Sequence, residues 1–155
     1  MLFRSFGCKV LGYAPRPKEA AQQWLTYVSL EELLRQSDIV TLHCPLTDET
    51  RGLIGAEELA MMKPGAYLVN MARGPVVDSE ALATALNGCH LAGAAIDVFE
   101  QEPPIPQEHP LLNARNCRVT PHIGFASQQS MALRARIVFD ALQGWLEGRE
   151  VNRVL

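Results

Sequence analysis

Short apolar runs alternate with amphipathic segments along this chain of 155 residues. The alternation predicts repeated βα units, in which helices join parallel strands buried beneath them. The expected strands, in chain order, are residues 8–13, 38–43, 66–70, 91–98 and 118–120. The pattern therefore predicts an α/β fold built on a parallel sheet, with the strand at 66–70 buried.

Capping residues and helix breakers mark the first two expected helices. Ser29 and Glu32 have the spacing of a capping box and predict a helix over 29–36. A second helix over 56–62 is expected to stop at Lys63-Pro64-Gly65, because proline cannot donate and glycine tolerates a positive φ.

Two further helices are expected, separated by a long connection. Asp78 can cap a helix that runs to about residue 87. The proline-rich stretch 99–116 has no convincing periodicity and is expected to be one long loop. Ser127 can cap a closing helix that ends at Gly148. This last helix carries an apolar stripe of period near 3.6, formed by Val138, Ala141, Leu142, Trp145 and Leu146.

Composition excludes several functions without changing the expected fold. The net charge of −3 and the absence of a basic run give no electrostatic basis for binding nucleic acid or an anionic membrane. The four cysteines form no CxxC, so neither a metal site nor a disulfide scaffold is expected. No apolar stretch approaches the length of about 18 residues typical of a membrane span. We therefore expect a cytoplasmic protein.

Three segments each carry one residue capable of chemistry at the end of an apolar run. They are 70–74 (NMARG), 97–103 (DVFEQEP) and 120–124 (TPHIG), and they supply an arginine, a carboxylate and a histidine. A parallel sheet presents such strand ends to a crevice. Together the three groups could clamp a substrate carboxylate, tune an imidazole and move a proton, which suits the oxidation of a 2-hydroxy acid.

These segments resemble the signatures of the D-isomer-specific 2-hydroxyacid dehydrogenases, the family that includes phosphoglycerate, glyoxylate and formate dehydrogenases. The resemblance begins near Phe6 and runs to the C-terminus. It rests on five colinear motifs, which are 43–50 (HCPLTDET), 62–66 (MKPGA), 70–78 (NMARGPVVD), 93–103 (GAAIDVFEQEP) and 120–124.

The resemblance implies a catalytic role for three residues. Arg73 would bind the substrate carboxylate and carbonyl oxygen, for which a planar guanidinium is well shaped. His122 would act as general acid and base, and Glu102 would hold its imidazole and favour the charged form. Taken singly, each residue is also explained as a solvated charge or part of a turn, and their joint occurrence in family order favours the catalytic interpretation.

The same resemblance implies a site for a nicotinamide cofactor. Asp97 would contact the carboxamide. The other residues expected to line the cofactor cleft are Cys44, Pro45, Thr50, Met71, Ala72, Arg73, His122 and Gly124. NAD is expected, with NADP as an open alternative, because Ala14 stands where the family usually has Asp and because Arg16 and Lys18 lie nearby.

One hallmark of a dinucleotide-binding fold is missing from the sequence, because it contains no GxGxxG. We therefore expect a partial Rossmann-type, doubly wound parallel sheet that lacks its first strand and its phosphate loop, followed by a long C-terminal helix. In the strand order 3-2-1-4-5-6 this absence would leave strands 2 and 4 without their shared neighbour. The expected domains are 1–125, a truncated dinucleotide-binding domain, and 126–155, a helix and tail that would return towards a missing substrate domain.

Two hypotheses for function follow. The first is a D-2-hydroxyacid dehydrogenase that acts on a small carboxylate-bearing substrate and whose full-length parent is a homodimer; the second is a truncated remnant or nucleotide-binding module without turnover. The identity of the hydroxy acid stays open. His90 and His109 have no evident partner pattern and are assigned no chemistry, whereas His43 is expected to fix its loop.

Overall fold

The computed structural model describes residues 5–15, 23–101 and 104–149. The chain divides between Pro121 and His122 into two compact units. The domain boundary that the sequence suggests, after residue 125, stays a prediction. The first unit contains both sheets, and the second contains the long C-terminal helix.

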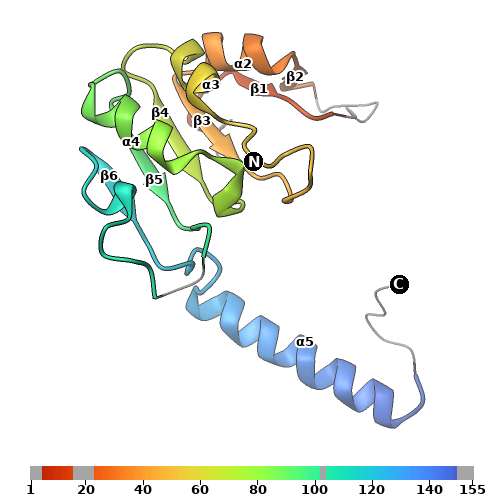
Figure 1. Ribbon diagram of the computed structural model, residues 1–155. Helices are drawn as coiled ribbons and strands as arrows, with labels where there is room; N and C mark the ends of the chain where they lie inside the picture. Colours follow the sequence, from red (N-terminus) through yellow and green to blue (C-terminus); the bar gives the residue numbers. More distant parts are fainter. Residues whose placement is uncertain (1–4, 16–22, 102–103, 150–155) are drawn as a thin grey trace. The chain divides into compact units, whose positions relative to one another are not determined.

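The main sheet of the first unit has four parallel strands in the order β3-β4-β5-β6 (Figure 1). The strands are β3 (Ile39–Leu42), β4 (Tyr67–Asn70), β5 (Gly93–Ile96) and β6 (Cys117–Val119). All four were expected from the apolar runs; β3, β4 and β5 are shorter than their runs, and β6 is shifted by one residue from the expected 118–120. The α/β fold and the parallel sheet are thus confirmed.

A separate two-stranded parallel sheet pairs β1 (Val10–Gly12) with β2 (Leu25–Tyr27). Among the described residues, β1 and β3 are not hydrogen-bonded neighbours. In the strand order 3-2-1-4-5-6 of a dinucleotide-binding sheet, strand 1 stands between strands 2 and 4. If β2, β1 and β3 correspond to strands 3, 2 and 4 of that sheet, the position between β1 and β3 is the one predicted to be empty. The sequence did not predict β2, because its three residues Leu25–Tyr27 include a threonine and form no apolar run.

The helices of the first unit begin and end close to the expected residues. They are α2 (Leu30–Gln36), α3 (Ala56–Met61) and α4 (Ser79–Asn87). The Ser29 hydroxyl accepts from the Glu32 amide at 3.1 Å and the Asp78 carboxylate accepts from the Ala81 amide at 3.0 Å, which confirms both N-caps. Two 3₁₀ turns, η1 (Gly74–Val76) and η2 (Pro110–Leu112), were not expected.

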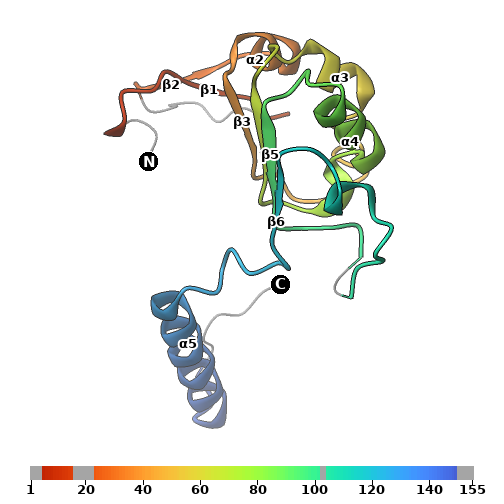
Figure 2. The same ribbon diagram turned by 90° about the vertical axis from the view of Figure 1, so that its left-hand side faces the viewer.

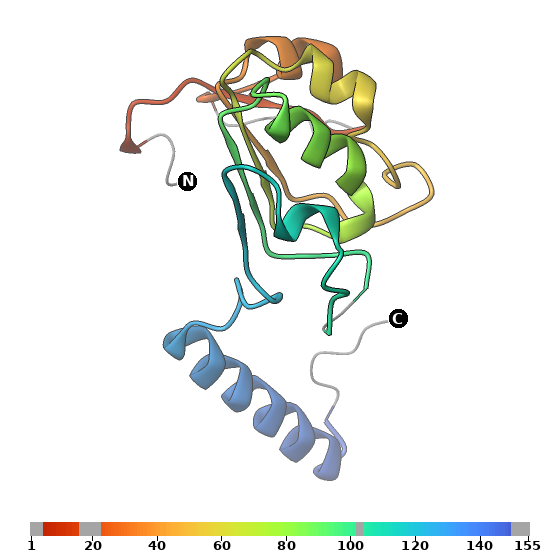
Figure 3. The same cartoon turned by 60° about the vertical axis from the view of Figure 1, so that its left-hand side comes forward.

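The core lies between the main sheet and these helices, and α3 and α4 lie on one face of the sheet (Figures 2 and 3). Side chains alternate accordingly, since Val40 and Leu68 are buried whereas Ile39 and Tyr67 are 53% and 51% exposed. The expectation of a wholly buried β4 is therefore wrong, because no helix of the described first unit covers the second face. The largest fully buried apolar side chains are Leu34, Ile54, Leu59, Met62, Leu68, Val76, Leu82, Leu86 and Leu111.

The second unit is dominated by α5 (Gln128–Leu146). Ser127 caps it as expected, its hydroxyl accepting from the Ser130 amide at 3.1 Å. Gly148 follows the helix with φ +73°, a conformation that glycine adopts without strain. The predicted apolar stripe is present but exposed, with Val138 at 64% and Trp145 at 70%.

Candidate active site

The carboxyl ends of the four main strands form one aligned row. Leu42 pairs with Asn70, Asn70 with Ile96, and Ile96 with Val119. The next residue along each strand therefore lies at the same edge of the sheet. These residues are His43, Met71, Asp97 and Thr120, and the three motifs singled out in the sequence begin at or beside them.

Asn70 shapes the turn that carries Arg73. Its side chain is buried, with the oxygen accepting from the Ala72 amide and the amide group donating to the Arg73 carbonyl, both at 3.0 Å. Arg73 itself is exposed, and its guanidinium donates to the Ala72 carbonyl at 2.6 Å. Sequence reasoning assigned no role to Asn70, although a lone polar residue at the end of an apolar run is the signal that could have identified it.

Gly74 brings the turn after β4 against the loop after β5. A Cβ atom built on Gly74 would lie 1.9 Å from the carbonyl carbon of Phe99 and 2.4 Å from the amide nitrogen of Glu100. Only glycine allows two backbones to approach this closely. The segment that begins with Arg73 and the segment that follows Asp97 are thus held in direct contact.

Asp97 is a buried carboxylate at the end of β5, and 3% of it is exposed. Its oxygen accepts a hydrogen bond of 2.5 Å from the Thr120 hydroxyl at the end of β6. Its amide donates to the Asn70 carbonyl at 3.1 Å, so the backbone is fixed as well. A buried acceptor at a strand end suits an amide N–H donor such as a nicotinamide carboxamide.

The segment after β3 carries three of the predicted cofactor residues. The Thr50 hydroxyl donates to the Pro45 carbonyl at 2.7 Å and accepts from the Thr47 amide at 2.8 Å, so it folds this loop from inside. Partial burial raises the pKa of the Cys44 thiol, although a hydrogen bond involving its own backbone opposes the rise. The thiol therefore stays neutral at pH 7. A ring nitrogen of His43 lies 2.8 Å from the hydroxyl of Thr41 in β3, and the expected loop-fixing role of His43 stays a prediction.

His122 is the first residue of the second unit and has a strained backbone. Its φ is +55°, in the left-handed region that few residues other than glycine adopt, although histidine is among the better tolerated. Its ring meets the Phe125 ring edge to face, with 6.0 Å between centroids. Gly124 lies in the same loop. Glu102, the third predicted catalytic residue, lies outside the described residues, and the roles of all three stay predictions.

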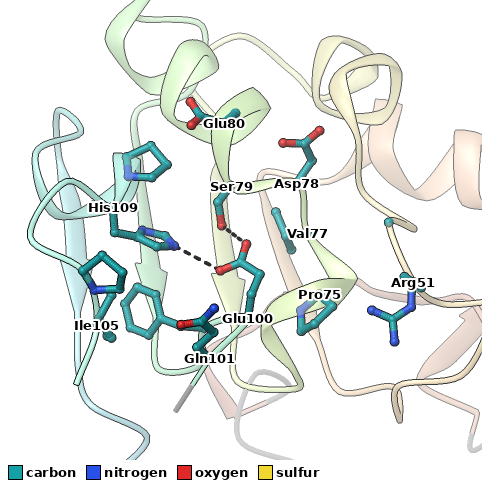
Figure 4. Close-up of a pocket in the computed structure, with 14 residues that line it drawn as sticks. Arg51, Pro75, Val77, Asp78, Ser79, Glu80, Glu100, Gln101, Ile105 and His109 are labelled. Carbon is teal, nitrogen blue, oxygen red and sulfur yellow. Dashed lines mark hydrogen bonds and ion pairs between the residues drawn. The ribbon is translucent and has the colours of Figure 1, made fainter. Parts of the chain in front are cut away.

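A cavity of about 530 Å³ lies at the N-terminal end of α4, beside the turn after β4 and the loop after β5 (Figure 4). Within it, the Ser79 hydroxyl donates to Glu100 at 2.6 Å, and a ring nitrogen of His109 lies 3.0 Å from the other Glu100 oxygen. The sequence shows no partner pattern for His109, and the structure supplies its partner in Glu100. No short sequence motif marks these two contacts, because Ser79 lies at the start of α4 whereas Glu100 and His109 lie 9 residues apart in the loop after β5.

This cluster makes stability depend on pH. Burial would raise the pKa of Glu100, but the hydrogen bonds from Ser79 and His109 outweigh it and hold the pKa below its ordinary value. The resulting stabilisation is complete above the unfolded-state pKa of about 4.3 and is lost as the pH falls through the folded-state pKa. Because the carboxylate is partly exposed, we expect a loss of about 1 kcal/mol or less.

Urea unfolding between pH 7 and pH 3 measures this effect in wild type and Glu100→Gln. The glutamine keeps a hydrogen-bonding oxygen but does not titrate, so its stability should fall less steeply below pH 5. Glu80→Gln, which removes another carboxylate from the same cavity wall, should follow the wild-type curve. Parallel curves for wild type and Glu100→Gln would show that the cluster carries no acid-linked stability.

The described residues can be compared with the requirements of a dinucleotide, a metal ion and a membrane span. Asp97 and the aligned strand ends fit the nicotinamide end of a dinucleotide, whereas the sequence has no GxGxxG turn for its pyrophosphate. No cluster of three or more histidine, cysteine or acidic side chains able to hold a metal occurs among the described residues. Within the same ranges, no helix is both long and apolar enough to cross a membrane.

Comparison with known proteins adds a family to this geometry. Residues 1–124 match the model of the D-isomer specific 2-hydroxyacid dehydrogenase NAD binding domain. The chain is 42% identical over 153 residues to a D-lactate dehydrogenase of Treponema pallidum, covering 91% of this chain and 45% of that protein. It is 44% identical over 147 residues to a glyoxylate reductase of Korarchaeum cryptofilum, covering 94% and 44%.

Solved structures agree with these relatives. The crystal structure of a D-lactate dehydrogenase with NAD⁺ from Lactobacillus jensenii superposes with a TM-score of 0.90 at 30% identity, covering 99% of this chain and 50% of that one. A D-lactate dehydrogenase from Aquifex aeolicus, complexed with NAD and lactic acid, gives a TM-score of 0.83 at 32% identity over 94% and 48%. The chain spans about half the length of the relatives it matches.

Proposed function

Because this chain belongs to the D-isomer specific 2-hydroxyacid dehydrogenase family, we propose that it forms the catalytic part of an enzyme that transfers a hydride between NAD(H) and a 2-hydroxy or 2-oxo acid. The observation that carries the proposal is the aligned row of strand ends, which gathers Asp97 and the Arg73 turn at one edge of the sheet. This is the edge at which open α/β sheets bind their ligands.

Arg73 is proposed to bind the substrate carboxylate. The guanidinium offers paired donors in a plane, which match the two oxygens of a carboxylate. Support comes from the turn itself, because buried Asn70 fixes the backbone of Arg73 while the side chain stays exposed to a ligand. A buried polar side chain, that of Asn70, thus holds the turn that presents Arg73.

His122 is proposed to be the acid and base. When bound, NAD⁺ supplies the hydride acceptor at its nicotinamide ring. His122 takes the hydroxyl proton of the 2-hydroxy acid as the C–H hydride leaves, and returns a proton to the carbonyl oxygen in the reverse direction. By family resemblance, Glu102 is proposed to stabilise the charged imidazole. The strained backbone at His122 supports a functional role, since such strain clusters at active sites.

A second candidate is a nucleotide-binding module without turnover. The break between β1 and β3 favours it, because the described strands form two separate sheets and β1 and β2 lie outside the aligned row of strand ends that would carry catalysis. This candidate keeps Asp97 and the aligned strand ends but lacks catalysis.

Titration of the purified chain with NADH and NADPH, followed by nicotinamide fluorescence, tests the proposal. We expect saturable binding that is tighter for NADH, then turnover with one or more of glyoxylate, hydroxypyruvate and pyruvate. Circular dichroism establishes that the sample is folded. A well-folded sample that binds neither nucleotide contradicts both candidates, whereas binding without turnover favours the second.

A further inference from the structure

The contact between Thr120 and Asp97 joins two strands at the edge where the nicotinamide is proposed to bind. The two residues are 23 positions apart in sequence, and the Thr120 hydroxyl lies 2.5 Å from a carboxylate oxygen of Asp97. Both backbones are fixed by the sheet, because the Asp97 amide donates to the Asn70 carbonyl at 3.1 Å and the Thr120 amide donates to the Ile96 carbonyl at 2.9 Å.

The hydroxyl restricts how the carboxylate can turn. The terminal torsion of an aspartate is broad, so a fixed backbone alone does not set the plane of its carboxylate. Threonine is stiff at χ1, which makes its hydroxyl a donor of defined direction. A carboxyl group has two oxygens with several lone pairs, so the Thr120 hydroxyl uses only part of its capacity to accept hydrogen bonds.

We propose that Thr120 is a positioning residue for the cofactor, whose hydroxyl orients the Asp97 carboxylate to accept a hydrogen bond from the nicotinamide carboxamide N–H. Thr120 acts through Asp97 and need not touch the cofactor. The inference rests on the proposed function, since it assigns this carboxylate to the carboxamide. It predicts an effect confined to ligands that carry a carboxamide.

Calorimetric titration of wild type, Thr120→Val and Thr120→Ser with three ligands tests this. NADH carries the carboxamide, the reduced 3-acetylpyridine analogue replaces it with a group lacking N–H, and ADP-ribose lacks the pyridine ring. Thr120→Val should weaken NADH binding about tenfold, by loss of one oriented hydrogen bond, and leave the other two affinities within about twofold. Thr120→Ser, which keeps the hydroxyl, should restore most of the NADH affinity.

Two controls separate positioning from general damage. Thr84→Val removes a threonine hydroxyl that donates to the Glu80 carbonyl within α4, so this variant should leave all three affinities unchanged. In an Asp97→Asn background, Thr120→Val should add little further loss of NADH affinity, because the group through which it acts is already altered.

The outcomes are distinguishable. An equal loss for NADH and ADP-ribose would make Thr120 merely structural, and unchanged NADH binding by a folded Thr120→Val variant would remove its role altogether; either result overturns the inference while the proposed function stands. If wild type binds ADP-ribose but not NADH, the carboxamide site itself is absent and the inference falls. If wild type binds none of the three ligands, the proposed function falls and the inference with it.

Discussion

Gly74→Ala is expected to destabilise the first unit by about 3 kcal/mol or more. The added Cβ would lie 1.9 Å from the Phe99 carbonyl carbon and 2.1 Å from its oxygen, far inside van der Waals contact. Both atoms belong to the backbone, so no side chain can rotate away. The turn after β4 and the loop after β5 must therefore separate, which also moves Arg73, the residue next to Gly74.

Chemical denaturation followed by far-ultraviolet circular dichroism measures this loss. Gly55→Ala is the matched control, because φ at Gly55 is −100° and its new Cβ would meet nothing closer than 3.4 Å. The control should cost about 1 kcal/mol, because Gly55 is the N-cap of α3 and alanine is a poorer N-cap residue than glycine, and this loss is well below the one expected at Gly74. Equal unfolding midpoints for the two variants would mean that the close approach at Gly74 is not required for folding.

His122→Ala is expected to lower kcat for reduction of a 2-oxo acid by about 10²- to 10⁴-fold, the usual contribution of a positioned acid–base group. NADH affinity should fall far less than kcat, because His122 is expected to line the cofactor cleft but its proposed role is proton transfer to the substrate oxygen. Stopped-flow measurement of NADH oxidation, with a separate fluorescence titration, resolves the two quantities. A kcat close to wild type would exclude His122 as the proton donor.

Arg73→Lys provides the comparison within the same site. Lysine keeps the positive charge but lacks the planar pair of donors, so KM for the oxo acid should rise while NADH affinity stays near wild type. His90→Ala is a control for loss of an imidazole elsewhere, since His90 lies 3.1 Å from the Leu59 carbonyl, away from the aligned strand ends. Its turnover should match wild type once folding is verified.

Much of the fold was legible in the sequence because its signals are local. A side-chain cap and the backbone amide that it binds lie three residues apart, so Ser29 and Asp78 located helix starts correctly. Apolar runs located the four main strands. The strand β2 escaped because its three residues carry no periodicity, and the single covered face of β4 escaped because an apolar run cannot reveal how many helices cover it.

Only part of the candidate site could be predicted from the sequence, because some of its residues are recognised by their contacts rather than by a motif. Motifs named Arg73, Glu102 and His122 as catalytic candidates and Asp97 as a cofactor contact, but motifs do not state what holds these residues. Gly74 and Thr120 act through contacts with a neighbouring loop or strand, whereas Asn70 is buried and acts within its own turn. Their importance follows from burial and close approach, which depend on the register between strands.

By itself the sequence determined the family, the order of the strands along the chain and the identity of the groups able to clamp a carboxylate and move a proton. The tertiary structure alone decided that Asp97 is held by Thr120 and that Glu100 pairs with Ser79 and His109. Helix caps and apolar runs are properties of a few consecutive residues, whereas these pairings join groups from 9 to 23 residues apart that only the packed parallel sheet and its loops bring within hydrogen-bonding distance.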